Sequence, residues 1–173
     1  RGMHWTMLVV IAASALAMGA LSLPAVAQPR EGKDYRKLAK PVATDAPAGK
    51  VEVIEFFSYG CPHCRDMSLK IHKWEAQQGK SIHLTRVPVT FGRAYWESLA
   101  RSYFALSDMG VMDQKLDAAI FEALFVKRID LGKPETMKAW LKEQNVNLAR
   151  FNAAYRHKNM ARRLAAADDL VRN

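Results

Sequence analysis

A short apolar segment that runs into Cys-Pro-His-Cys constrains this chain more than any other feature. Residues 51–57 are β-branched, aromatic or acidic, a composition that predicts a strand. Cys61, Pro62, His63 and Cys64 follow closely and open a segment with helical composition. The chain has no other cysteines, so no other disulfide competes for this pair. The pattern predicts a small disulfide at a strand-to-helix corner that can close and open again.

The beginning of the chain predicts export. Residues 7–23 contain no charge and follow Arg1 and His4, and residues 25–27 are Ala-Val-Ala. This is the pattern of a signal peptide, with cleavage expected after Ala27. A transmembrane anchor is the alternative, because the apolar run is nearly long enough to span a bilayer. An exported protein reaches an oxidising compartment, where a disulfide persists.

The remainder, residues 28–173, has the composition of a folded protein. Half of the whole chain is hydrophobic, which argues against disorder, and the net charge is +9. The lysines and arginines are scattered among acidic residues without interleaved aromatic residues. This positive balance therefore predicts a solvated surface and no binding of nucleic acid.

Hydrophobic periodicity predicts the order of the elements. Strands are expected at 51–58 and 81–89, with a helix at 62–78 between them and a further short strand near Tyr35–Leu38. Apolar residues then recur at helical spacing to the end of the chain. They form five expected helical faces, which lie within residues 96–106, 116–124, 137–141, 148–155 and 160–171.

The position of the cysteines predicts their reactivity. If Cys61 caps the helix, Pro62 takes the first helical position, where its missing N–H costs nothing. Cys61 is then exposed at a helix tip whose free N–H groups and dipole stabilise a thiolate. One apolar stripe is expected to pack inward and to leave Cys64 buried and inert, and it consists of Cys64, Met67, Ile71 and Trp74.

A stabilised thiolate sets the direction of the reaction. Only the reduced form has a thiolate, so each unit by which the thiol pKa falls favours that form by about 1.4 kcal/mol. The same energy moves a two-electron potential by about 30 mV, which makes the Cys61–Cys64 disulfide oxidising. A partly protonated His63 would add to the effect. The alternative for His63 is an ordinary surface residue.

Glu55 is the candidate proton carrier. On a strand it shares a face with Val53 and Phe57, so we expect a buried carboxyl with a raised pKa that shuttles a proton for Cys64. The alternatives are a glutamate at a frayed strand end, or one that pairs with Arg86 on the next strand. The remaining histidines lack the spacing of metal ligands and are expected to be surface or structural residues: His72, His83 and His157.

Several segments together resemble the exported thiol:disulfide oxidoreductases of the DsbA family. Pro-His between the cysteines is characteristic of that family. The segments are Gly32-Lys33-Asp34-Tyr35, Leu38, Lys40-Pro41-Val42 and the run from Val53 to Cys64. The resemblance implies an α/β, thioredoxin-like fold with an inserted helical domain. It divides the chain into a signal peptide at 1–27, a thioredoxin-like part at 28–92 and a helical insertion at 93–173.

The resemblance also implies a function. It implies a periplasmic dithiol oxidase that passes the Cys61–Cys64 disulfide to folding exported proteins through a mixed disulfide at Cys61. A quinone-linked inner-membrane partner similar to DsbB would reoxidise the pair, and no cofactor or metal is implied. Glu55 matches the family's buried acid, whereas Arg86 stands where the family usually has a lysine. DsbA proteins are themselves standard examples of this cysteine chemistry, so the direction argued above is not independent of the resemblance.

One departure from the family is expected to matter. DsbA proteins continue past the helical part with a cis-proline loop that faces the cysteines, two strands and a helix. This chain ends at Asn173 without a candidate for that proline, so we expect the loop and the last strands to be absent from it. The strand at 51–58 would then have an open edge. On this expectation, residues 28–173 by themselves are unstable or weakly active.

Two other functions remain open at this stage. A disulfide reductase or isomerase could use the same fold with a less oxidising pair. A binding protein could instead hold copper or zinc through Cys61, His63 and Cys64, although no fourth ligand lies within reach in the sequence.

Overall fold

The computed structural model describes residues 28–40 and 42–172 of the chain, which divides into two compact units, 1–42 and 43–173. In the first unit, the Gly32 N–H donates to the Tyr35 carbonyl at 2.7 Å, and Glu31 and Tyr35 form an isolated β-bridge. The strand predicted near Tyr35–Leu38 is therefore wrong, because a single bridge does not extend into a ladder. The predicted signal peptide, 1–27, lies outside the described residues.

The second unit begins with a strand, a helix and a parallel strand. These are β1 (Val51–Phe57), α1 (Pro62–Gln78) and β2 (Ile82–Pro88). Parallel strands need a crossover connection, and α1 provides it. The predicted order and bounds are confirmed to within one residue. The register places Glu55 of β1 directly opposite Arg86 of β2.

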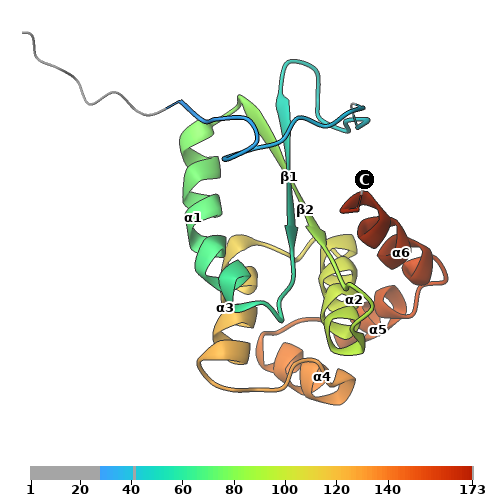
Figure 1. Cartoon of the computed structure of the whole chain (residues 1–173). Coiled ribbons are helices and arrows are strands. Elements are labelled where there is room, and N and C mark those ends of the chain that lie inside the picture. The colour runs from blue at the N-terminus through green and yellow to red at the C-terminus, as the bar shows by residue number, and fades with distance from the viewer. Residues whose placement is uncertain (1–27, 41, 173) are drawn as a thin grey trace, which may run out of the picture. The chain divides into compact units, whose positions relative to one another are not determined.

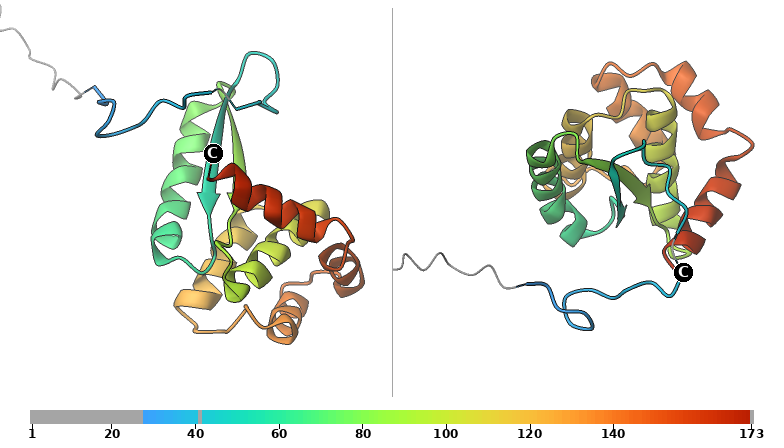
Figure 2. Two further views of the ribbon diagram at one scale, coloured as in Figure 1. Left: turned by 45° about the vertical axis from the view of Figure 1, so that its right-hand side comes forward. Right: turned by 90° about the horizontal axis from the view of Figure 1, so that it is seen from above.

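The elements that follow β2 in the described residues are all helices. They are α2 (Ala94–Asp108), α3 (Gln114–Phe125), α4 (Pro134–Glu143), α5 (Leu148–Tyr155) and α6 (Met160–Leu170). Capping side chains begin two of them, because Asp113 accepts from the Leu116 N–H and Asn147 accepts from the Arg150 N–H. The two strands have α1 on one side and α2 and α6 on the other (Figures 1 and 2).

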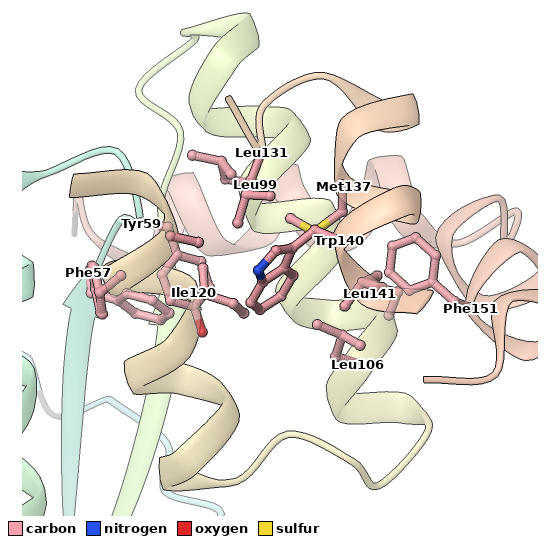
Figure 3. Packing of buried hydrophobic residues seen from close by; sticks show 13 residues of the cluster. Phe57, Tyr59, Leu99, Leu106, Ile120, Leu131, Met137, Trp140, Leu141 and Phe151 are labelled. Atoms are coloured by element: carbon pink, nitrogen blue, oxygen red, sulfur yellow. The ribbon is translucent and has the colours of Figure 1, made fainter. Parts of the chain in front are cut away.

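The main hydrophobic core joins the end of β1 to the helices. Phe57 and Tyr59 lie beside Ile120 of α3, and Trp140 of α4 lies to the right of Ile120 (Figure 3). The rings of Phe57 and Tyr59 pack edge to face with centroids 5.2 Å apart, and Tyr59 packs in the same way on Phe121 at 4.8 Å. The residues that lead into Cys61 are therefore anchored in the core of the helical segment.

The inward face of α1 differs from the prediction. Met67 is 49% exposed and Trp74 is 36% exposed, whereas the buried residue of the helix is Ser68. The helix contacts α3 and β2, and those contacts turn the side with Cys64, Ser68 and Ile71 inward. The predicted stripe is therefore wrong for Met67 and Trp74.

The strand β1 pairs only with β2 in the described part of the chain. Val51 is 67% exposed and Phe56 is 36% exposed, which leaves apolar surface along this strand. Across the same described ranges, no helix combines the length and hydrophobicity needed to cross a membrane.

Candidate active site

The cysteine motif begins α1 as the sequence predicts. Cys61 is the N-cap, with extended backbone angles of φ −103° and ψ 119°, and Pro62 takes the first helical position. The Cys61 carbonyl accepts from the Arg65 N–H at 3.2 Å and so starts the helix. The first turn contains no acidic residue, so nothing in that turn opposes a negative charge on the Cys61 sulfur.

Ser58 fixes the turn between β1 and α1. Its carbonyl accepts from the Cys61 N–H and its hydroxyl accepts from the Gly60 N–H, each at 3.1 Å. Ser58 is only 4% exposed, so these bonds are shielded from water. The turn therefore holds Cys61 at a set position relative to the end of the strand.

The two cysteines are free thiols in this structure, and both are partly buried. We expected an exposed Cys61 and a buried Cys64, and that contrast is not found: Cys64 packs against the hydrophobic core but is only partly buried, as Cys61 is. Pro62 and His63 are exposed.

Burial raises the pKa of the Cys64 thiol to about 11. Cys61 and the negative charge of Glu55 also raise this pKa, whereas a backbone hydrogen bond at Ser58 lowers it.

Glu55 pairs with Arg86. The Arg86 Nε–H donates to Glu55 Oε2 at 2.5 Å, and the two side chains are only 7% and 9% exposed. The Arg86 guanidinium also lies over the Phe57 ring, 4.1 Å from its centroid. Of the alternatives weighed for Glu55, the pair with Arg86 is therefore confirmed, and so is the burial of the carboxylate.

Asp117 of α3 also lies at this site, and sequence reasoning missed it. The residue is 1% exposed. Its Oδ1 accepts from Arg86 Nη1 and from the Tyr59 hydroxyl, both at 2.6 Å, and its Oδ2 accepts from the Ser68 hydroxyl at 2.7 Å. Burial alone would raise the pKa of this carboxyl, but Arg86 and the hydrogen bonds from Tyr59 and Ser68 outweigh burial and lower it.

One sequence signal could have found Asp117. It lies three and four residues before Ile120 and Phe121, both buried, so it occupies an apolar position of the helical period. An acidic residue at such a position needs a buried partner.

An open pocket of about 230 Å³ with a mixed polar and apolar lining adjoins these groups, and His72, Arg86 and Asp117 are among the residues that line it. His72 Nε2 lies 3.3 Å from Asp117 Oδ2, which makes His72 one of the structural histidines that the sequence predicts. Arg86 Nη2 is buried and has no hydrogen-bond partner within the described ranges. The guanidinium therefore contacts Glu55 and Asp117 through its other two nitrogens.

Metal binding was one of the open alternatives. Within residues 28–40 and 42–172, no group of three or more His, Cys, Asp or Glu side chains is arranged to hold a metal ion. The geometry at the helix tip is that of a thiol pair beside a buried ion-pair network.

Comparisons with known proteins agree with this geometry. The sequence pattern of the family described as Thioredoxin matches residues 39–169. The thiol:disulfide interchange protein DsbA of Bordetella parapertussis is 32% identical over 146 residues, which cover 84% of this chain and 68% of that protein. The chain belongs to the DsbA family. The DsbA of Burkholderia cepacia is 40% identical over 129 residues, 75% of this chain and 60% of that protein.

Solved structures of DsbA proteins have the same fold. The crystal structure of Pseudomonas aeruginosa DsbA superposes with a TM-score of 0.70 at 30% identity, over 78% of this chain and 69% of that one. The oxidoreductase NmDsbA1 from N. meningitidis gives 0.68 at 30% identity, over 83% and 74%. The chain spans about three fifths of the length of the first curated relatives, 60% for the Burkholderia protein and 57% for the Pseudomonas aeruginosa protein.

Proposed function

We propose that this chain carries the reactive centre of an exported dithiol oxidase. One observation carries the proposal: Cys61 caps a helix at the end of β1, with Cys64 one turn later, in a chain of the DsbA family. We assign residues 28–92 to a thioredoxin-like part and residues 93–173 to a helical insertion.

The reaction is an exchange of disulfides. A substrate thiolate attacks the sulfur of Cys61 in the Cys61–Cys64 disulfide, the bond between the two cysteines breaks, and Cys64 leaves and takes up a proton. A second substrate thiolate then attacks the substrate sulfur of the mixed disulfide and expels Cys61. The substrate loses two electrons and two protons and gains a disulfide, and the enzyme gains two thiols.

Each site residue has a proposed role in this exchange. Cys61 is the sulfur that substrates attack in the first step. In the second step it is the leaving sulfur, and the free N–H groups at the helix N-terminus favour its departure as a thiolate. Pro62 stiffens the corner, and His63 adds positive charge when protonated. The raised pKa of Cys64 favours its protonation once the internal disulfide opens. Glu55 supplies negative charge that acts on Cys64 and favours this protonation.

The proposed location and partners follow from the resemblance of the chain to its relatives. The leading segment directs the chain to the periplasm and is cleaved after Ala27. There the protein meets reduced, unfolded exported proteins, and a DsbB-like membrane partner accepts the two electrons from the reduced pair.

The direction of transfer can be measured with this chain. The wild type is equilibrated with glutathione buffers, and the fraction of reduced protein gives the potential; a C61S variant, which cannot form the disulfide, is the blank. An oxidase has a potential well above that of thioredoxin, which is about −270 mV. It also forms disulfides in a reduced, unfolded substrate. A potential close to that of thioredoxin, without such transfer, would instead identify a reductase.

A further inference from the structure

Asp117 comes from the helical segment but makes its contacts with the thiol-bearing part of the fold. Arg86 on β2, Tyr59 in the turn before Cys61, and Ser68 on α1 all donate hydrogen bonds to its carboxylate. Ser68 lies one helical turn after Cys64, and Tyr59 lies two residues before Cys61. The carboxylate is therefore attached to the elements on both sides of the cysteine pair.

The guanidinium of Arg86 is divided between two carboxylates. Its Nε donates to Glu55 at 2.5 Å and its Nη1 donates to Asp117 at 2.6 Å. All three side chains are at most 9% exposed, so water screens these charges poorly. Two negative charges thus share one cation. Glu55 has only part of the neutralisation that a pair with Arg86 alone would give.

A neutral residue at position 117 would suit the core better if packing were its only role. A buried carboxylate costs free energy when it leaves water, and the attraction of its partner often only offsets that cost. An amide at this position could still satisfy both hydroxyls, because its oxygen accepts from Tyr59 and its NH2 group can donate to the Ser68 hydroxyl. The specific consequence of a carboxylate at position 117 is that its negative charge competes with Glu55 for Arg86.

We propose that Asp117 is a positioning residue for the cysteine pair. It binds Nη1 of Arg86, so Arg86 neutralises the Glu55 carboxylate only in part, and the negative charge of Glu55 continues to act on Cys64. Glu55 is itself among the groups that keep Cys64 protonated. Asp117 thereby maintains the difference between the inner and outer sulfurs that the exchange needs. This role rests on the proposed function only in taking Cys61 and Cys64 as the reacting pair.

Other charged and titratable groups face Asp117, and the test has to separate them. His72 and Ser68 approach from α1, Tyr59 from the turn, Arg86 from β2, and Tyr103 of α2 interacts electrostatically with Asp117. Of these, Arg86 also contacts Glu55, so it is the route by which Asp117 acts on Cys64.

The experiment follows the alkylation of Cys64 against pH in the full chain. C61S leaves Cys64 as the sole thiol, and Asp117→Asn is added to it. Removing the charge lets Arg86 neutralise Glu55 more fully, so the alkylation midpoint moves down by about one pH unit, at the lower end of what a nearby charge produces. An unchanged midpoint in folded D117N overturns the proposal.

Two further variants separate charge from packing. Asp117→Glu disturbs the packing more than Asn does but keeps the charge, so its midpoint stays near that of C61S. Ser68→Ala removes one donor from Asp117, which then holds Arg86 more strongly, so the midpoint stays or rises. If either variant moves the midpoint down as far as D117N, loosened packing explains the effect and the proposal is wrong.

The variants have to be compared in the folded state. All are measured in sucrose, which is excluded from protein surfaces and favours the native state, and near-UV circular dichroism checks their packing. If D117N still does not fold, a midpoint that falls by about one pH unit in D117E or S68A overturns the proposal, and midpoints that stay or rise support it. None of these titrations depends on the direction of disulfide transfer, so they are independent of the oxidase assay.

Discussion

The indole of Trp96 occupies the space that a side chain on Gly60 would need. A Cβ built on Gly60 would lie 2.5 Å from Trp96 Nε1 and 2.7 Å from its Cδ1. Trp96 is itself held by Arg93, whose guanidinium lies 4.6 Å from the ring centroid, and by Phe91. The residue before Cys61 therefore has to be small for the start of α2 to pack against the turn.

Replacing Gly60 by Ala should displace either the indole or the turn. We expect G60A to lose about 1–3 kcal/mol of stability, as overpacked sites do, and to change the tryptophan fluorescence. Urea unfolding followed by fluorescence measures the loss. In a Trp96→Leu background the same substitution should cost less, because the clash is removed. An equal cost in both backgrounds would rule out Trp96 as the cause.

Removing Arg86 should leave two buried carboxylates without their cation. We expect Arg86→Met to cost about 3–5 kcal/mol, the usual cost of breaking a buried ion pair. The triple variant E55Q/R86M/D117N contains no buried charge from this network and should recover most of that stability. Chemical denaturation of both proteins is the measurement. A triple variant as unstable as R86M would show that packing on Phe57, and not charge, is what Arg86 contributes.

The two cysteines should differ in their reaction with iodoacetamide. Burial, with the charge of Glu55, raises the pKa of Cys64, and alkylation proceeds through the thiolate. In C61S, Cys64 should therefore react with a midpoint above the value of about 8.5 for free cysteine. In C64S, Cys61 at the helix tip should react faster at pH 7. Equal rates for the two variants at pH 7 would contradict this assignment of inner and outer sulfurs.

Asp168 of α6 should stabilise the loop after β2. Its carboxylate accepts from the Thr90 N–H at 2.6 Å, from the Thr90 hydroxyl and from the Phe91 N–H at 3.3 Å. We expect Asp168→Asn to cost about 1.5–3 kcal/mol at pH 7, as hydrogen bonds to charged groups do. Asp169→Asn is the matched control, since Asp169 is 69% exposed and its pair with Arg172 is a surface pair worth about 1 kcal/mol or less.

The contribution of Asp168 should also depend on pH. Burial alone would raise the pKa of its carboxyl, but the hydrogen bonds from Thr90 and Phe91 outweigh burial and lower it. The folded pKa thus lies below the unfolded value of about 3.9, so the stabilisation is present above that pH and disappears as pH falls through the folded pKa. The stability gap between wild type and D168N should narrow on acidification. A gap that stays constant down to about pH 2 would contradict the ionised state of Asp168.

Local signals were enough to predict the centre of the site. The bounds of α1 follow from Pro62 at its first position, and the two parallel strands follow from their β-branched composition. The pair of Glu55 and Arg86 was one of the alternatives because each lies on a predicted strand. Each of these features depends on residues that are neighbours in the chain or in one strand pair.

The remaining features depend on contacts between distant parts of the chain. Asp117 meets Tyr59 and Ser68 across 58 and 49 residues, and Asp168 meets Thr90 across 78. Periodicity can mark a helix face as buried without saying which element covers it. For the same reason it favoured Met67 and Trp74 as inward residues, although α3 and β2 select the side with Ser68.

The amino-acid sequence by itself therefore determined the strand-to-helix corner with its cysteine pair, because capping, proline placement and strand composition act over a few residues. Only the tertiary structure decided which acids share Arg86 and which side of α1 is covered. Those outcomes depend on how the helices pack onto the strands. An opposite charge or a hydrogen-bond donor offsets the desolvation of a buried charge, and any element that packs nearby can provide it.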